Sequence, residues 1–327
     1  MKLWKRMLIG ALVLCLCAGL LSGCRRRAGS DNGKLKVVVT VFPIYDWVRN
    51  LLGDRAEDVE LTLLEQSGAD LHNFQPTVRD IYTITSCDLF ICVGGESDNW
   101  VDDALAQADR KDLRAVKLLD ELGSAAREEE DPEGAEESHG HEHEDEGPEY
   151  DEHIWLSVRN AALLCPILAE ALAEKDPEHA DVYRSCCGAY VDRLNGLDAA
   201  YAEAVEAAPG KTVLFADRYP FLYLIKDYGL TAYAAFSGCS AESEASFQMI
   251  SSLVRRVDEL NLRHILVLEG SDRRLATTIV SESRGKDAEI LEIDSMQSVT
   301  MAQIRAGANY LDIMQRNLEV LSKALSD

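Results

Sequence analysis

Residues 34–43, KLKVVVTVFP, form an apolar, β-branched run that ends at Pro43. Such a run is typical of a strand that is buried on both faces of a parallel sheet. The following residues 44–52, IYDWVRNLL, have the spacing of a helix that ends before Gly53. Short apolar segments then alternate with helical patterns, at 59–66, 89–95 and 114–119. This part of the chain therefore predicts an α/β lobe with a mainly parallel sheet covered by helices.

A long helical pattern separates this lobe from a second one. It runs from Pro177 to Ala208, with Pro177 suited to a helix start and Gly210 suited to a helix end. A helix of about thirty residues is roughly 45 Å long, which is enough to brace two lobes. Beyond it, strands are predicted at 211–216, 231–236, 264–270 and 288–293. The expected fold class is α/β, with two lobes that each have a mainly parallel sheet and are joined by one long backbone helix.

The first residues have the features of an export signal. A basic start, MKLWKR at 1–6, precedes a nearly continuous apolar run at 7–21 that is short for a membrane-spanning helix. The run ends in LSGC at 21–24, which resembles the bacterial lipobox, so Cys24 is the expected lipidation site. A lipid on Cys24 would hold the mature chain on the extracytoplasmic face of a bacterial cell membrane. A plain membrane anchor is the alternative interpretation of the same segment.

These features together give a predicted domain organisation. It comprises a signal peptide at 1–23, a tether at 24–34, an N-terminal lobe at 35–175, a linking helix at 176–209 and a C-terminal lobe at 210–327. Residues 121–152 of the first lobe are dominated by Glu and Asp, which predicts a solvated insertion. This insertion contains His139, His141 and His143, which we interpret as an accessory set of weak metal ligands.

The composition limits the class of partner. The chain of 327 residues has a net charge of -24 and 47% hydrophobic residues, enough for packed cores. The acidity argues against a nucleic-acid partner, because phosphates are bound by Lys and Arg. Six cysteines follow Cys24, none with the spacing of a zinc ribbon, and we expect mostly buried free thiols.

Side chains that could bind a metal lie at or near the ends of predicted strands and at the end of the acidic insertion. The set is His72, His153, Asp217, Glu269 and Asp294, and Arg218 follows directly after Asp217. Because the carboxyl ends of parallel strands meet at one edge of a sheet, we expect these residues to converge. Two imidazoles with carboxylates suit Zn²⁺, and they also suit Mn²⁺ because oxygen ligands favour harder ions. Taken alone, each carboxylate could instead cap a helix, and a single histidine in a loop is usually a surface residue.

Several segments resemble the motifs of one family. GADLHNFQPTVRD at 68–80 and DEHIWLS at 151–157 are similar to the two histidine motifs of the zinc- and manganese-binding lipoproteins of ABC importers, the cluster A-I substrate-binding proteins. Similar segments recur at 223–230, 237–246 and 292–296. The resemblance extends from about Lys36 to the C-terminus, and it implies one metal ion held between two lobes.

The resemblance also implies a set of ligands. It makes His72, His153 and Asp294 metal ligands. At the third ligand position the family has His or Glu, whereas this chain has Arg218, which has no lone pair to donate. We expect the neighbouring Asp217 to take this role instead.

Two residues are reserve candidates: Glu269 as an alternative ligand, and Arg218 as a residue that orients a carboxylate ligand. The His-rich insertion resembles that of the zinc-type members, so Zn²⁺ is the expected ion and Mn²⁺ the alternative. The resemblance therefore implies a monomeric, lipid-anchored binding protein that captures Zn²⁺ between its lobes and delivers it to a membrane permease, without enzymatic activity.

Two other functions remain as alternatives. A metal-dependent hydrolase would use three protein ligands and leave one position for an activated water. The sequence contains neither an HExxH motif nor a nucleophile elbow to support this class. A surface adhesin is the other alternative, because a lipid anchor permits it.

Overall fold

The computed structural model describes residues 33–66, 71–130, 149–238 and 245–326. The predicted signal peptide, the lipidation site Cys24 and the three histidines of the acidic insertion lie outside these residues. The described residues from Leu35 onwards form one compact unit. Within the described part of the chain, no helix combines the length and the apolar character that a membrane crossing requires.

The N-terminal lobe contains a four-stranded parallel sheet in the order β2-β1-β3-β4. Its strands are β1 (Leu35–Val39), β2 (Val59–Leu63), β3 (Leu89–Cys92) and β4 (Arg114–Lys117). Val37 and Val39 pack into one core and Val38 into another, because side chains alternate between the two faces of a strand. All three are buried, as the β-branched run at 34–43 predicts.

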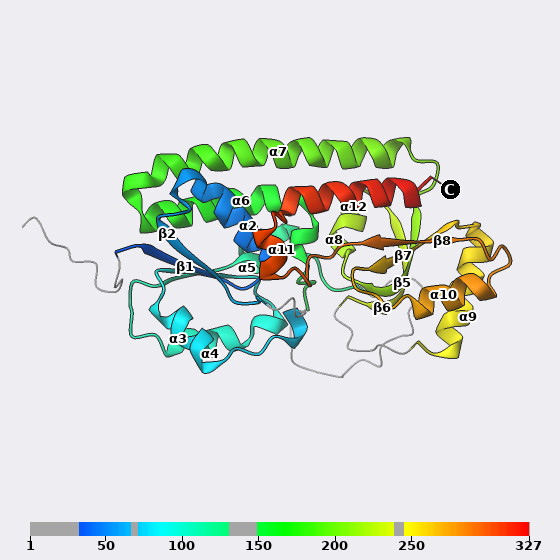
Figure 1. Cartoon of the computed structure of the whole chain (residues 1–327), viewed down its shortest axis with the longest axis horizontal. Coiled ribbons are helices and arrows are strands. Elements are labelled where there is room, and N and C mark those ends of the chain that lie inside the picture. The colour runs from blue at the N-terminus through cyan, green and yellow to red at the C-terminus, as the bar shows by residue number, and fades with distance from the viewer. Residues whose placement is uncertain (1–32, 67–70, 131–148, 239–244, 327) are drawn as a thin grey trace, which may run out of the picture. The chain divides into compact units, whose positions relative to one another are not determined.

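Helices cover both faces of this sheet (Figure 1). One face carries α2 (Phe42–Leu52) and α6 (Val158–Lys175), and the other carries α3 (Val78–Ser86) and α4 (Trp100–Ala106). The remaining short elements of the lobe are α5 (Leu118–Leu122) and 3₁₀ turns at Gly53–Arg55, Leu71–Asn73, Glu96–Asp98, Gly123–Ala125 and Ile154–Leu156. Ser157 begins α6, where its hydroxyl accepts a hydrogen bond from the backbone N–H of Asn160 at 3.0 Å.

The C-terminal lobe repeats this plan with a parallel sheet in the order β6-β5-β7-β8. Its strands are β5 (Thr212–Tyr219), β6 (Thr231–Ser237), β7 (His264–Leu268) and β8 (Glu289–Ile293). Its helices are α8 (Leu222–Asp227), α9 (Phe247–Leu260), α10 (Arg274–Glu282), α11 (Met301–Arg305) and α12 (Tyr310–Ala324). Leu214 and Ala216 pack with α9 and α10, whereas Val213 and Phe215 join the core that includes α7 and α12.

One long helix, α7 (Ala180–Ala207), begins after a 3₁₀ turn at Pro177–His179 and contacts both lobes. It packs against α2 and α6 of the first lobe and lies beside α12 of the second (Figure 1). Tyr201 of α7 donates a hydrogen bond from its hydroxyl to the carbonyl oxygen of Met314 in α12 at 2.7 Å. The predicted architecture of two α/β lobes joined by a long helix is therefore confirmed.

The ends of the acidic segment are more ordered than its composition suggested. Leu122 is buried, and Asp151 and Glu152 are each only 2% exposed. A β-bridge joins Glu128 to Tyr150, so the two ends of the segment lie together. The solvated insertion predicted for 121–152 therefore includes residues that belong to the core. The described cysteines are free thiols, and all but Cys186 are buried, as expected.

Candidate metal centre

His72 lies in the 3₁₀ turn Leu71–Asn73, which follows the carboxyl end of β2. Leu71 is buried in the core, while the His72 side chain keeps 16% of its surface exposed. The Nδ1 atom of His72 lies 2.8 Å from the Oγ of Ser97. Because the Ser97 hydroxyl donates its own hydrogen to Oε2 of Glu152 at 2.5 Å, its oxygen accepts from Nδ1–H of His72. This arrangement leaves the lone pair of His72 on Nε2.

His153 is fully buried, directly before the 3₁₀ turn that leads into α6. Oδ1 of Asp151 accepts a hydrogen bond from the backbone N–H of His153 at 2.8 Å and lies 3.2 Å from its Nδ1. A carboxylate beside Nδ1 favours the tautomer that carries the proton there, so the lone pair of His153 is also on Nε2. Trp155 packs against this imidazole, with ring centroids 5.5 Å apart.

The two imidazoles meet at their Nε2 atoms, which lie 3.3 Å apart. Their ring planes are inclined by 62°. Tetrahedral zinc with Zn–N bonds of about 2.0–2.1 Å places two nitrogen ligands about 3.3 Å from each other. The pair His72 and His153 therefore has the nitrogen separation of two adjacent ligands of one tetrahedral ion.

A buried carboxylate supports this pair from the N-terminal lobe. Glu152 accepts a hydrogen bond from the backbone N–H of Ser97 at 2.7 Å, and its Oε2 lies 3.4 Å from Nδ1 of His72. Burial raises the pKa of Glu152 to about 7, although the hydrogen bonds from Ser97 oppose the shift. Gly95 makes room for this carboxylate: its φ is +84°, and a Cβ at this position would overlap the Glu152 side chain.

The C-terminal lobe adds a side chain that the sequence reasoning missed. Gln297 lies in the loop after β8, and its Nε2 is 3.0 Å from Nε2 of His153. A flip of the amide would present Oε1 instead, which makes Gln297 a candidate oxygen ligand. Gln297 is neutral and lies four residues beyond β8, so neither its charge nor its distance from the strand end indicates a metal ligand. The available signal was a polar side chain in the loop that begins with the motif EIDSM.

Glu269 holds this loop in place. Its carboxylate accepts hydrogen bonds from the backbone N–H and the hydroxyl of Ser295, both at 2.8 Å. Burial, and then the charge of Asp294, raises the pKa of Glu269. The loop is also tied to the other lobe, because Nε1 of Trp155 donates to the carbonyl oxygen of Ser295 at 2.9 Å. The position of Gln297 is therefore determined by contacts to both lobes.

The predicted carboxylate ligands have other partners. Asp294 accepts a hydrogen bond from the backbone N–H of Met296 at 2.7 Å, and burial raises its pKa. Asp217 accepts hydrogen bonds from the backbone N–H groups of Arg218 at 2.9 Å and Leu268 at 3.3 Å. In the residues that the structure describes, no group of three or more His, Cys, Asp or Glu could hold a metal ion. The structure thus brings His72 and His153 together, without Asp217 and Asp294.

Two further residues of the C-terminal lobe lie close to the site or to these carboxylates. Arg218 is in β5, opposite Phe236 of β6, at an irregularity in the strand register that follows Phe215. Gly238 approaches the histidine pair, because a Cβ added there would lie 3.3 Å from Cε1 of His153 and 2.8 Å from the carbonyl oxygen of Tyr219. A side chain at position 238 would therefore press on the imidazole.

Two lobes of parallel α/β structure, joined by one long helix and enclosing convergent polar side chains, define a class of protein. It is the class of two-lobed substrate-binding proteins. The site is small and is built from imidazole and amide groups, which fits a metal ion better than an organic molecule.

The match of this chain to a family model identifies the particular family. Residues 37–324 match the model described as zinc-uptake complex component A, periplasmic (ZnuA). The match covers most of the chain, so this protein belongs to the ZnuA family. The resemblance to zinc-type importer proteins is thereby confirmed, and the family consists of components of an uptake system rather than enzymes.

Curated relatives are also named as zinc-binding or zinc-uptake proteins. The zinc-binding lipoprotein AdcA of Streptococcus pneumoniae (serotype 4) is 30% identical over 317 residues, which are 96% of this chain and 60% of AdcA. The high-affinity zinc uptake system protein ZnuA of Bacillus subtilis is 27% identical over 324 residues, which are 97% of each chain. This chain therefore spans about 60% of the length of the AdcA relatives and nearly all of the Bacillus protein.

Solved structures agree with the fold. The Zn(II)-bound ZnuA-like domain of Streptococcus pneumoniae AdcA superposes with a TM-score of 0.71 at 26% identity, covering 90% of this chain and all of that domain. The periplasmic zinc-binding protein TroA of Treponema pallidum has the same TM-score at 20% identity, covering 90% of this chain and all of that one. The second likeness extends to the fold alone.

Proposed function

We propose that this protein is the extracytoplasmic binding component of an ABC importer, which captures Zn²⁺ between its lobes and delivers it to a membrane permease. The observation that carries this proposal is the contact between Nε2 of His72 and Nε2 of His153 at 3.3 Å. Membership of the zinc-uptake family and the Zn(II)-bound state of a related domain support zinc as the cargo. Mn²⁺ is the alternative cargo, and two imidazoles favour zinc over it.

The ligand set follows from the contacts around the pair. We assign His72 and His153 as ligands through Nε2, and Oε1 of Gln297 as the ligand that the other lobe contributes after an amide flip. The backbone N–H bonds that Asp217 and Asp294 accept leave further lone pairs on both carboxylates, so these bonds are compatible with metal ligation. We propose that Asp217 and Asp294 remain ligand candidates of the C-terminal lobe beside Gln297, with Glu269 fixing the Gln297 loop and Arg218 outside the ligand set.

This ligand set has a consequence for affinity. Two neutral imidazoles and a neutral amide alone would leave the double positive charge of zinc uncompensated. Oxygen from a carboxylate would neutralise part of that charge and bind more tightly. We therefore expect a carboxylate of the C-terminal lobe, from Asp217 or Asp294, to contribute to tight zinc binding.

The location and the partners rest on the sequence. We propose that Cys24 carries the lipid that anchors the protein at the extracytoplasmic face of the membrane, where it acts as a monomer. The histidines His139, His141 and His143 would collect zinc weakly near the tight site. Both ideas rest on the sequence of segments outside the described residues.

The direct test compares two histidine variants of a chain from which residues 131–148 have been removed. Elemental analysis should find about one tightly bound zinc ion per chain, and added zinc should raise the melting temperature. His72→Ala should lose both effects, whereas His179→Ala should keep them. His179 serves as the matched control because it lies next to α7, with its Nδ1 2.8 Å from Asp176. An unchanged zinc content in His72→Ala would refute the proposed site.

A further inference from the structure

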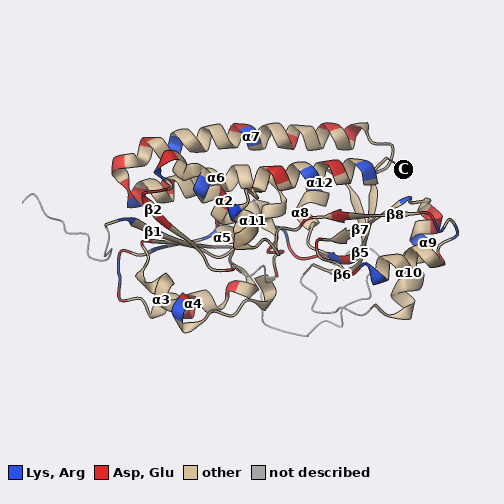
Figure 2. Ribbon diagram, viewed as in Figure 1, with Lys and Arg blue, Asp and Glu red and all other residues tan. Residues whose placement is uncertain are grey.

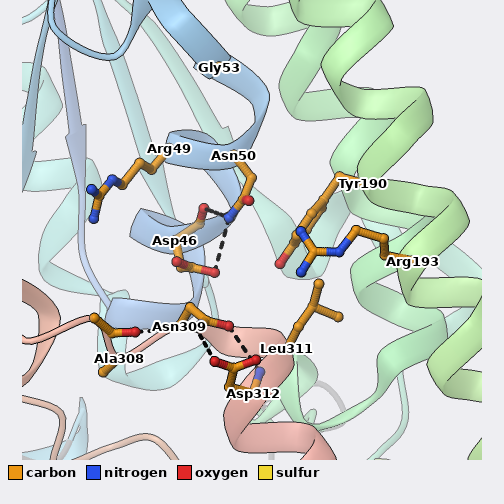
Figure 3. A pocket seen from close by; sticks show the side chains of 11 residues that line it. Asp46, Arg49, Asn50, Gly53, Tyr190, Arg193, Ala308, Asn309, Leu311 and Asp312 are labelled. Atoms are coloured by element: carbon orange, nitrogen blue, oxygen red, sulfur yellow. Dashed lines mark hydrogen bonds between the residues drawn. The ribbon is translucent and has the colours of Figure 1, made fainter.

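A cavity of about 500 Å³ lies where α2, α7 and the beginning of α12 meet (Figure 3). It shares no residue with the metal centre. Helix α2 belongs to the N-terminal lobe and α12 packs on the sheet of the C-terminal lobe, so the cavity lies at a joint between the lobes. Its volume is within the range of small-molecule sites, about 300–1,000 Å³.

The inner wall of the cavity is formed by two buried polar side chains. Asp46 is 5% exposed, and its Oδ2 accepts hydrogen bonds from the backbone N–H of Tyr310 at 3.0 Å and from Nδ2 of Asn50 at 3.2 Å. Tyr190 is 3% exposed, and its hydroxyl points towards the Asp46 carboxyl (Figure 3). Within the described part of the chain, this hydroxyl interacts with the Asp46 carboxyl and lowers its pKa, but the contact lacks the geometry of a normal hydrogen bond. A buried hydroxyl in this state is costly unless a ligand satisfies it.

Two arginines supply positive charge at the rim of the same cavity. Arg193 lies over the ring of Tyr190, with its guanidinium carbon 5.9 Å from the ring centroid, and Arg49 lies on α2. Lys and Arg are interspersed with Asp and Glu along α7 and α12 (Figure 2). Nevertheless, neither Arg49 nor Arg193 has a carboxylate within ion-pair distance among the described residues, and both attract Asp46 only at longer range. In a chain with a net charge of -24, this leaves two guanidinium groups for an external anion.

The negative charge of the cavity comes from Asp46 and from Asp312. Asp312 lies in the first turn of α12 and accepts a hydrogen bond from Nδ2 of Asn309 at 2.7 Å. A simple anion in the cavity would therefore face two carboxylates, and a simple cation would face two guanidinium groups. A molecule with one charge of each sign avoids both conflicts.

We propose that this cavity is a second ligand site, which binds a free, zwitterionic α-amino acid. The carboxylate of the ligand meets Arg193, with Arg49 at the opposite rim. Its ammonium group lies between Asp46 and Asp312, and the Tyr190 hydroxyl completes its hydrogen bonds. The ligand touches α2, α7 and α12 at once, so its binding stabilises the joint between the lobes.

The first test is a binding experiment with the full chain at pH 7.5. The probes are L-alanine, L-serine, L-leucine, L-glutamine, L-glutamate and L-lysine, with acetate and methylammonium as ligands of a single charge. At least one amino acid should bind with a Kd below about 1 mM by calorimetry and raise the melting temperature. Acetate and methylammonium should not bind at that concentration. The proposal is overturned if none of the six amino acids binds below 1 mM, or if acetate binds as tightly as they do.

The second test uses variants of the cavity. Arg193→Gln should weaken binding of the amino acid at least tenfold, whereas Arg184→Gln should leave it unchanged. Arg184 is the matched control because it lies on the same helix but pairs with Glu170 at 2.7 Å, outside the cavity. Tyr190→Phe should weaken binding several-fold without lowering the melting temperature of the free chain, since the removed hydroxyl makes no hydrogen bond of normal geometry within the described residues. Wild-type affinity in Arg193→Gln would overturn the proposal.

Discussion

The two lobes contribute to the metal centre in different ways. The N-terminal lobe supplies His72 and His153, and the Nδ1 atom of each imidazole lies against an oxygen that fixes its tautomer. The C-terminal lobe supplies Gln297, a neutral amide whose loop is held by Glu269 and by Trp155 of the first lobe. The N-terminal lobe thus determines which nitrogen atom of each imidazole is available to the metal. The C-terminal lobe determines the charge of the side chains that complete the site.

Substitution of a histidine should cause the largest loss of zinc affinity. We expect His153→Ala to weaken zinc binding by about three orders of magnitude, or about 4 kcal/mol, because a single imidazole remains to bind the ion. The measurement is competition with a chromophoric chelator. His264→Ala is the control, since His264 begins β7 and lies 4.0 Å from Glu289. A loss of less than tenfold in His153→Ala would mean that the N-terminal lobe does not dominate binding.

The joint between the lobes can be tested through pH. Asp46 accepts from the backbone N–H of Tyr310 at the start of α12, and burial raises its pKa from 3.8 to about 6. Hydrogen bonding to Tyr310 and the charges of Arg49 and Arg193 oppose this shift. A carboxyl with a raised pKa binds its proton more tightly in the folded state. It therefore destabilises the fold above about pH 6, and the penalty disappears as the pH falls towards 4.

The size of this effect follows from the shift. A difference of about two pKa units corresponds to about 3 kcal/mol in the free energy of unfolding. Urea unfolding of wild type and Asp46→Asn at pH 8 and pH 4 should show that the advantage of the Asn variant over wild type shrinks by about this amount. An advantage that does not change with pH would show that the Asp46 contact does not link α12 to the first lobe through a buried charge.

Conversion of the Gln297 amide into a carboxylate tests what the C-terminal lobe contributes to zinc affinity. Gln297→Glu should tighten zinc binding by about 10–100-fold, because the added negative charge compensates the ion at close range. Gln107→Glu adds the same charge on an exposed side chain outside the site, and it should leave the affinity within about twofold. Competition titration measures both. Equal affinities for Gln297→Glu and wild type would exclude position 297 from the ligand set.

A smaller effect is expected from the glycine that admits the Glu152 side chain. Gly95→Ala should weaken zinc binding about tenfold, because the new Cβ displaces the carboxylate that positions His72 through Ser97. Gly123→Ala is the matched control: Gly123 also has a positive φ, at +49°, but open space surrounds its Cβ position. Both variants should lose about 1–2 kcal/mol of stability from the strained backbone, and only Gly95→Ala should lose zinc affinity.

Local sequence was a good guide wherever one residue's surroundings depend on its neighbours in the chain. The run at 34–43 predicted a strand buried on both faces, and Val37 and Val38 are buried in separate cores. The helical spacing after Pro177 predicted a long helix, which is observed as α7. A continuous β-branched run and helical spacing are both patterns within a short segment, so each indicates its element without any contact to the rest of the chain.

Contacts between distant residues were harder to anticipate. The family resemblance predicts Asp294 as a ligand and leads to Asp217 at the third position, but it does not reveal the backbone N–H groups that each carboxylate contacts. Ser97 and Gln297 were overlooked, because neither residue type signals a metal site by itself. Ser97 is 25 residues from His72, and Gln297 is 144 residues from His153. Such neighbours are set by how the loops of two lobes meet.

The sequence by itself thus determined the α/β class, the two lobes, the long helix and the family resemblance, because each depends on patterns within short segments. It also named His72 and His153. Only the tertiary structure decided that these two imidazoles face each other, that a neutral amide from the second lobe joins them, and that a charged cavity lies at the joint between the lobes. The reason is physical: the energy of a buried polar group depends on the atoms that surround it, and those come from distant parts of the chain.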